Sequence, residues 1–228
     1  MDKYSNSIEH QAYGIVPPDW YYKASKSHLT WMITTIPKKV LEIGCAEGNY
    51  GAFLKQKYKA EVWGIELNQK AANEAAKKLD HVLTGDALHL MDQLEESSFD
   101  YIALFDVLEH MMNPETVLMN AKRLLTKDGS IILTVPNVMY ISNLYRMLIK
   151  KDWEYIDHGV LDITHLRFFT KKSLRRMLKN LGYSIIECRG IQPPKGLFLF
   201  LFYIFDILTL GYHHNSKYTQ FACVLKSR

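Results

Sequence analysis

The central part of this chain alternates short apolar, β-branched runs with segments whose apolar residues recur at helical spacing. Such alternation is typical of a parallel sheet whose strands are joined by covering helices. Two late apolar runs are expected to pair as an antiparallel hairpin at the sheet edge, with a long insertion between them. The expected strands span residues 39–44, 61–67, 81–84, 99–105, 130–135, 183–191 and 220–225.

Length and composition limit the class of protein. A chain of 228 residues suits one well-cored domain, and 48% hydrophobic with 23% charged residues excludes a disordered or fibrous protein. The formal net charge of +4 does not require a polyanionic partner, and we expect no DNA partner. Cys45, Cys188 and Cys223 form no C-x-x-C pair, and no signal peptide or membrane span is visible, so a cytoplasmic protein is expected.

A glycine-containing turn follows the first expected strand in the run Gly44-Cys45-Ala46-Glu47-Gly48. Glycine at a strand-to-helix turn lets backbone N–H groups approach a ligand at the carboxyl end of the sheet. Glu66 ends the second strand, where a carboxylate can accept hydrogen bonds from ribose hydroxyls, and Asp86 follows the third strand. A solvated strand end and a helix cap are the alternative structural roles of these two acids.

These positions together resemble the class I S-adenosylmethionine-dependent methyltransferases. The resemblance implies an α/β fold, a three-layer Rossmann-like sandwich with a seven-stranded, mostly parallel sheet and an antiparallel last strand. It also implies S-adenosylmethionine as cofactor and S-adenosylhomocysteine as product. The residues that the resemblance assigns to cofactor binding are Glu42, Gly44, Ala46, Glu47, Gly48, Asn49, Tyr50, Glu66, Leu67, Asp86, Ala87, Asp106 and Val107.

Ala46 departs from the family pattern, which often has glycine at this position. The alanine adds only a methyl group, and we expect its backbone not to require positive φ. A dinucleotide site of the G-x-G-x-x-G type would need glycine at both Ala46 and Asn49, so that alternative is excluded.

The segment Asp106-Val107-Leu108-Glu109-His110 follows the fourth strand and resembles the small-molecule branch of the family. Methyltransferases that act on base amino groups carry an Asn/Asp-Pro-Pro-aromatic tetrad here, and its absence argues against such acceptors. His110 is interpreted either as a catalytic base or as a residue that supports the loop.

Residues 153–170 contain Gly-x-Leu-Asp-x-Thr-His-x-Arg-Phe-Phe-Thr, which resembles a group of glycan- and envelope-building methyltransferases. This similarity predicts a pocket lid over residues 137–169. His165 and His158 are candidate bases for deprotonating a hydroxyl acceptor, and Arg167 is a candidate substrate-binding residue. Alternatively, Asp162, His165 and Arg167 lock the loop by hydrogen bonds. A metal site at His158, Asp162 and His165 is disfavoured because the segment does not suit a regular helix, so no metal is expected.

Residues 1–38 are expected to form cap helices that precede the cofactor-binding domain at 39–228. A helix over 21–33 would place aromatic residues at the cofactor mouth, with Tyr21 and Tyr22 near the cofactor or acceptor. Covering the sheet edge is the alternative role of these aromatic residues.

An apolar run at 197–210 lies within an insertion at 193–215 and is too short to span a bilayer. It can pack on its own domain, form a homodimer contact or act as a peripheral membrane anchor. A basic helix begins at Thr170 and is expected to be a solvated face, with an anionic acceptor as the alternative.

These features predict a methyltransferase that acts on a small-molecule or glycan acceptor, at oxygen. A non-catalytic cofactor-binding or scaffold protein of envelope or glycan biosynthesis is one alternative. An RNA or protein methyltransferase is another.

Overall fold

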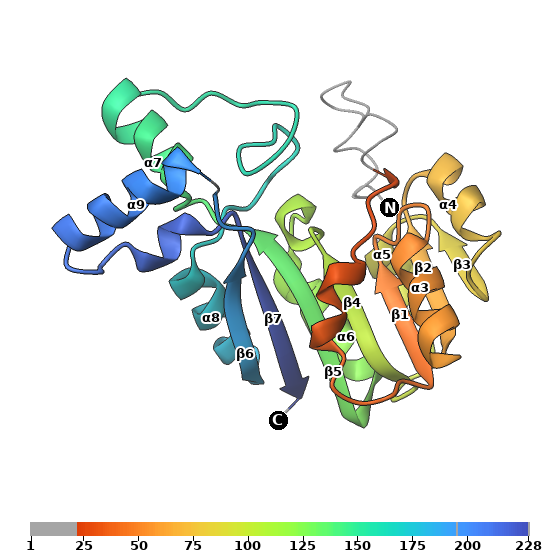
Figure 1. Ribbon diagram of the computed structural model, residues 1–228. Helices are drawn as coiled ribbons and strands as arrows, with labels where there is room; N and C mark the ends of the chain where they lie inside the picture. Colours follow the sequence, from red (N-terminus) through yellow and green to blue (C-terminus); the bar gives the residue numbers. More distant parts are fainter. Residues whose placement is uncertain (1–21, 195, 228) are drawn as a thin grey trace.

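The computed structural model describes residues 22–194 and 196–227. Seven strands form one sheet in these residues, as the sequence predicts (Figure 1). The strands are β1 Lys39–Ile43, β2 Glu61–Glu66, β3 His81–Thr84, β4 Phe99–Phe105, β5 Leu125–Pro136, β6 Tyr183–Ile191 and β7 Gln220–Ser227. Their order across the sheet is β3-β2-β1-β4-β5-β7-β6.

The strand order reverses at β1, which pairs in parallel with both β2 and β4. Ligands of open α/β sheets bind in the crevice at such a point, beyond the carboxyl ends of the strands. β7 runs antiparallel to both β5 and β6, so the expected hairpin with a long insertion is confirmed. The antiparallel strand also returns Gln220 to the carboxyl end of the neighbouring β5, where it pairs with Pro136.

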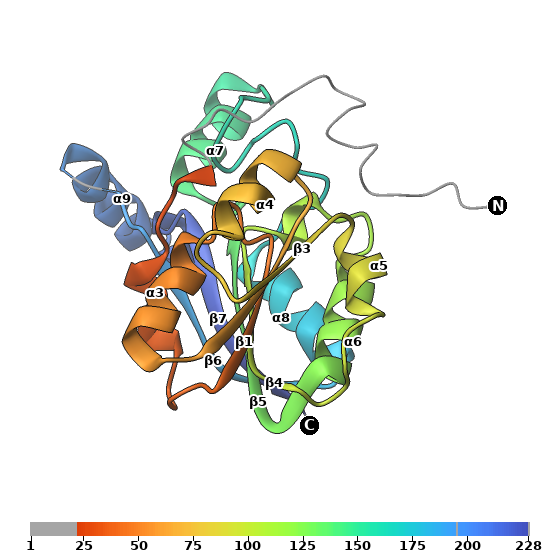
Figure 2. The same ribbon diagram turned by 90° about the vertical axis from the view of Figure 1, so that its right-hand side faces the viewer.

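Helices cover both faces of the sheet, as the two views show (Figures 1 and 2). One buried cluster includes side chains of α5, α6 and α8, and a second includes side chains of η1, α3 and α4. The helical elements are η1 Ser27–Met32, α3 Asn49–Tyr58, α4 Gln69–Ala75, α5 Ala87–Met91, η2 Leu108–His110, α6 Pro114–Leu124, α7 Ile141–Tyr145, a π-helical turn η3 Arg146–Lys150, α8 Lys171–Asn180, α9 Leu197–Leu208 and η4 His214–Lys217.

Side chains cap the start of two helices, and the helix start predicted at Thr170 is confirmed. The Asn68 side chain accepts the N–H of Ala71 at the start of α4. The Thr170 side chain accepts the N–H of Ser173 at 3.0 Å, and Ser173 returns a bond to the Thr170 backbone, which completes a capping box for α8. These local bonds satisfy N–H groups that have no partner inside the helix.

Two expected elements differ from the structure. The predicted 21–33 helix is not continuous: residues 24–26 have no helical structure, and the 3₁₀ helix η1 follows them, in which Thr30 donates its hydroxyl to the Ser27 carbonyl. Serine and threonine side chains compete in this way with the regular helical bonds. The fifth strand begins at Leu125 rather than at residue 130, because α6 ends at Leu124 and the chain turns at once into strand pairing with Phe99.

The expected lid, residues 137–169, begins with α7 and η3 and then continues without a regular helix. The two ends of the segment bond to each other, because the N–H of Val138 bonds to the Phe169 carbonyl at 3.0 Å. The N–H of Asn137 bonds to the carbonyl of Thr219, just before β7, at 2.8 Å. In the described residues, no helix is long and apolar enough to cross a membrane.

Candidate active site

The turn between β1 and α3 brings the chain close to the end of β4. Gly44 has φ 68°, and a Cβ atom at this position would lie 2.7 Å from a methyl group of Val107. Glycine is therefore required here by both backbone conformation and space. The neighbouring Gly48 also has positive φ, 72°, and begins α3.

The expectation for Ala46 was wrong, because its backbone has φ 50°. This left-handed conformation is unfavourable for a residue with a Cβ atom. It points the Ala46 N–H at the Glu66 carboxylate, which accepts it at 2.8 Å. The turn is thus held by the very carboxylate that the sequence assigns to a ribose.

Glu66 is buried at the end of β2, and its second oxygen accepts the N–H of Asn68 at 2.8 Å. Burial raises the pKa of Glu66, although the hydrogen bonds from the Asn68 and Ala46 backbones oppose that rise. Tyr22 lies beside this end of β2, because its hydroxyl accepts the Asn68 amide at 3.3 Å. Burial and the nearby Glu66 charge raise the pKa of Tyr22.

Glu42 lies on β1 under the same turn and accepts the N–H of Gly51 at 3.1 Å. Burial raises the pKa of Glu42 to about 8, opposed by the Gly51 hydrogen bond and reinforced by Glu66. A proton is therefore held at this carboxyl group near neutral pH.

Asp106 at the end of β4 collects partners from both ends of the chain. Lys26 forms an ion pair with one carboxylate oxygen. Thr134 and Gln220 each donate to the other oxygen at 2.8 Å. Burial by itself would raise the pKa of Asp106, but Lys26 and these hydrogen bonds hold the pKa below its ordinary value. Lys26 and Gln220 carry no motif that sequence analysis could have used to place them here.

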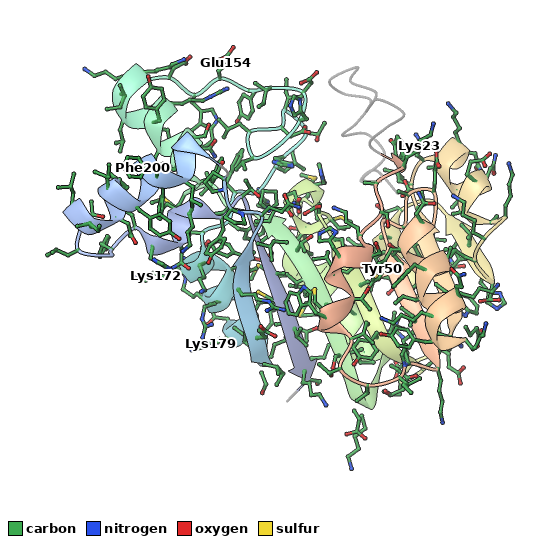
Figure 3. The ribbon with its side chains drawn as sticks, in the orientation of Figure 1. Lys23, Tyr50, Glu154, Lys172, Lys179 and Phe200 are labelled. Atoms are coloured by element: carbon green, nitrogen blue, oxygen red, sulfur yellow. The ribbon has the colours of Figure 1, made fainter. Side chains whose placement is uncertain are left out.

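Several other candidates have structural partners. Asp86 caps α5 by accepting the His89 N–H at 3.1 Å, so its alternative role is present. Lys78 bonds to the Glu47 carbonyl and to the Asn49 side chain. Tyr50 is buried with its ring 4.9 Å from the Phe105 ring (Figure 3). Ala87 and Val107 are also buried, while Leu67 is partly exposed and Tyr21 lies outside the described residues.

The loop after β4 meets the lid, which brings two distant motifs together. The carbonyl of Glu109 accepts the N–H groups of Leu166 and Arg167 at 2.8 and 3.0 Å. His110 Nδ1 lies 3.2 Å from the Thr164 carbonyl, and the His110 and His165 rings are 4.8 Å apart. The Asp-x-x-Glu-His motif and the Thr-His-x-Arg motif therefore form one wall.

His165 has the properties of a neutral base. Its Nδ1 lies 3.1 Å from the Val160 carbonyl, which can only accept, so Nδ1 carries the proton and Nε2 has a lone pair. Nε2 lies 4.0 Å from a Glu109 oxygen. Burial lowers the pKa of His165, which keeps the imidazole neutral at physiological pH.

Glu109 is fully buried, and within the described residues neither of its oxygens has a hydrogen-bond partner. Burial, together with Asp106, raises its pKa well above the ordinary value. Atoms of Glu109, His110 and His165 lie within 4.8 Å of one another. One carboxylate and two imidazoles are also a donor set that divalent transition metals accept.

The structure separates His158 from this cluster. His158 is exposed, and its ring bonds to the adjacent Asp157 at 2.7 Å. Asp162 accepts the backbone N–H and the hydroxyl of Thr164, and Arg167 donates to the Met112 carbonyl at 2.5 Å. Together with the His165 ring, which bonds to the Val160 carbonyl, these contacts are the ones that the alternative interpretation of Asp162, His165 and Arg167 predicts. The disfavoured metal set of His158, Asp162 and His165 does not come together.

Comparisons with known proteins agree with this geometry. Residues 24–188 match a protein family described as a methyltransferase domain. The ubiquinone biosynthesis O-methyltransferase of Azoarcus sp. strain BH72 is 26% identical over 163 residues, which cover 68% of this chain and 67% of that protein.

Solved structures share the fold. A SAM-dependent methyltransferase from Archaeoglobus fulgidus superposes with a TM-score of 0.71 at 17% identity, over 92% of this chain and 97% of that one. The cyclase SpnF superposes with a TM-score of 0.60 at 15% identity, over 92% of this chain and 80% of that one. The family match covers most of the chain, including the glycine turn, the ends of β1, β2 and β4, and the lid. The chain therefore belongs to the methyltransferase-domain family.

Proposed function

We propose that this protein transfers a methyl group from S-adenosylmethionine to a hydroxyl oxygen of a small-molecule acceptor. Family membership makes the chain a methyltransferase. S-adenosylmethionine is its cofactor, and it supplies an electrophilic methyl group on a positively charged sulfur. S-adenosylhomocysteine is then the second product.

The gathering of carboxyl groups at the strand ends carries the proposal. The Glu66 charge raises the pKa of Glu42, and the Asp106 charge raises the pKa of Glu109. Lys26 lowers the pKa of Glu42, Asp106 and Glu109, so these three carboxyl groups lie around one lysine. Asp106 keeps its negative charge among these groups, and a carboxylate at this position favours the sulfonium and ammonium charges of the cofactor. Glu66 is placed to accept ribose hydroxyls with its remaining lone pairs, and the free oxygen of Asp86 to accept an adenine amino group.

His165 is the group that accepts the proton in this proposal. The acceptor oxygen attacks the methyl carbon while the carbon–sulfur bond breaks, and the hydroxyl proton moves to Nε2 of His165. Nδ1 donates to the Val160 carbonyl, which leaves Nε2, 4.0 Å from a Glu109 oxygen, as the basic nitrogen. His110 is the second candidate base, since its Nδ1 is likewise oriented by the Thr164 carbonyl. The role of the protein is to align donor, acceptor and base.

Two observations support a small hydroxyl-bearing acceptor. The Azoarcus relative is named as an O-methyltransferase of ubiquinone biosynthesis. Base-amino methyltransferases carry a Pro-Pro tetrad that this chain lacks after β4. A glycan hydroxyl could be methylated by the same chemistry, so sugars are included among the acceptors tested. SpnF is named as a cyclase and shares this fold, so the fold by itself does not specify methyl transfer, and the reaction has to be measured.

The test is methyl transfer from labelled S-adenosylmethionine to a panel of catechols, sugars and carboxylic acids. His165→Asn keeps an amide donor for Val160 but removes the basic nitrogen. We expect kcat to fall by about 10²- to 10⁴-fold, the range for losing a general base, while calorimetric affinity for the cofactor is retained.

His158→Asn is the matched control, because the same substitution is made on an exposed histidine outside the cluster, and it should leave kcat unchanged. A chelator distinguishes proton transfer from metal binding at Glu109, His110 and His165. Activity that survives dialysis against EDTA assigns proton transfer to the imidazole without a metal. Full activity of His165→Asn would remove His165 from the mechanism. Transfer of the label to RNA or protein, and not to a small molecule, would contradict the proposed small-molecule acceptor.

A further inference from the structure

Helix α9 presents an apolar face to solvent. Phe200, Ile207 and Leu208 are 63%, 73% and 77% exposed, and Tyr203 and Ile204 are exposed beside them. These five residues follow the spacing i, i+3, i+4, i+7 and i+8, which is one continuous side of a helix. A helix of a soluble protein ordinarily turns such a side inward.

The buried side of α9 contains a charged group. Asp206 is 8% exposed and bonds to His214 at 3.0 Å. Phe202, one helical turn earlier on the same side of α9, is 1% exposed. The helix is therefore held in place by its inner side, and the apolar side remains outside. Leu210 and Tyr212 continue the exposed apolar surface beyond the end of α9. A contiguous apolar surface of this kind marks a binding surface.

A basic cluster on α8 lies next to the segment that follows α9. Lys171, Lys172, Arg175, Arg176 and Lys179 line a shallow depression together with Asn180 and Asn215. Lys171 bonds to Asn215 at 3.3 Å, which connects α8 to the segment that follows α9. No described acidic side chain forms an ion pair with these five basic residues. Figure 3 shows Phe200 of α9 and Lys172 of α8 toward the β6 edge of the sheet.

A second apolar segment lies at the same end of the molecule. Leu148 and Ile149 of η3 are exposed, and Lys150 and Lys151 follow them directly. Figure 1 places the α7–η3 segment and α9 at the same end of the molecule, away from β3. The pattern of apolar residues beside lysines is thus repeated in a separate part of the chain.

We propose that this surface docks on an anionic phospholipid bilayer, with α9 lying in the interface and the α8 cluster contacting headgroups. The 12 residues of α9 extend about 18 Å, short of the roughly 30 Å hydrocarbon core, so the helix lies along the membrane surface. Apolar insertion combined with basic contacts is the physical basis of such binding.

Charge favours a bilayer over a second copy of the chain. The chain carries a net charge of +4, and Asn215 connects the basic cluster to the segment that follows α9, so two copies joined through this surface would bring like charges together. An anionic membrane offers the opposite charge beside an apolar interior. The proposal rests on this surface alone and not on the methyl-transfer reaction.

The test is flotation of the full chain with vesicles of phosphatidylcholine alone and of phosphatidylcholine with 30% phosphatidylglycerol. We expect binding to the anionic vesicles that weakens as salt rises. The double variant Ile204→Ser/Ile207→Ser should reduce the partition coefficient about tenfold or more. Ile36→Ser is its control, because Ile36 is an exposed isoleucine just before β1 and outside the surface.

A charge-reversal pair tests the basic cluster. Lys172→Glu/Arg176→Glu should reduce binding to anionic vesicles at least about tenfold, since each basic residue near the surface contributes about a fivefold factor. Lys57→Glu/Lys127→Glu makes the same change of net charge on α3 and β5, and should reduce binding far less. Circular dichroism confirms that each variant is folded.

Three outcomes would overturn the proposal. Equal flotation of the α9 variant and the native chain would show that the apolar face of α9 does not contribute to membrane binding. Concentration-dependent dimers that the α9 variant abolishes, without vesicle binding, assign the surface to a second copy. Binding of inorganic phosphate without vesicle binding reduces the cluster to a free-anion site. Methyl transfer to a water-soluble acceptor is measured separately, so failure here leaves the proposed reaction intact.

Discussion

At the scale of single residues, carboxyl groups in similar positions acquire different protonation states. Asp106 holds its charge because Lys26, Thr134 and Gln220 surround it, whereas Glu42 and Glu109 are buried with few or no donors. The sequence indicated acids at the strand ends but could not rank them. That ranking depends on which donors the fold brings within hydrogen-bond distance.

Glu42 should make stability depend on pH. Its pKa is about 8 in the folded protein and near 4.5 in an unfolded chain. Between these values the unfolded chain has released the proton that the folded chain keeps, so the free energy of unfolding falls as pH rises. Glu42→Gln cannot ionise, and we expect it to remove about 2 kcal/mol or more of that fall.

Urea denaturation at a series of pH values measures this effect. Glu61→Gln serves as the control. Glu61 is exposed and begins β2, at the end of the strand away from Glu66, so this variant should retain the native pH profile. Parallel profiles for Glu42→Gln and the native chain would contradict the assigned pKa.

At the scale of elements, the glycine turn between β1 and α3 shows where local sequence and structure disagree. The pattern predicted the turn and its ligand-facing position, but it did not predict that Ala46 would adopt φ 50°. Ala46 lies in the turn after β1, whereas Glu66 ends β2. The hydrogen bond from the Ala46 N–H to Glu66 therefore sets this conformation from outside the local sequence. A residue can hold an unfavourable backbone conformation when its surroundings determine it.

Ala46→Gly should stabilise the protein. Glycine adopts the left-handed conformation without the Cβ clash, so the free energy of unfolding should rise by about 0.5–1 kcal/mol. Ala52→Gly makes the same substitution inside α3, where glycine lowers stability by a similar amount. In thermal and urea unfolding, the free energy of unfolding should therefore rise for Ala46→Gly and fall for Ala52→Gly. Equal destabilisation by the two substitutions would show that Ala46 is not strained.

At the scale of the whole molecule, the site draws on the N-terminal segment, the centre of the sheet and the C-terminal hairpin. Lys26 and Gln220 meet at Asp106 although 80 and 114 residues separate them from it in sequence. Ligand binding should therefore stabilise the folded chain globally.

S-adenosylmethionine at about 100 times its dissociation constant should stabilise the fold by about 2.7 kcal/mol, visible as a higher midpoint of thermal unfolding. Glu66→Ala should weaken cofactor affinity by about 1.5–3 kcal/mol, the range for a hydrogen bond to a charged group, and reduce the shift at fixed cofactor concentration. Glu61→Ala on the same strand should leave affinity and shift unchanged. A full shift in Glu66→Ala would exclude Glu66 from the cofactor site.

The sequence by itself determined the strands, the order of the elements, the caps at Asn68 and Thr170, and the glycine turn, because each depends on neighbours within a few residues. Tertiary structure decided which side chains meet: Lys26 with Asp106, and Glu109 with His165. It also separated His158 from the cluster and turned the apolar side of α9 outward. Such contacts join residues far apart in the chain, and packing of the sheet and lid sets them rather than any local preference.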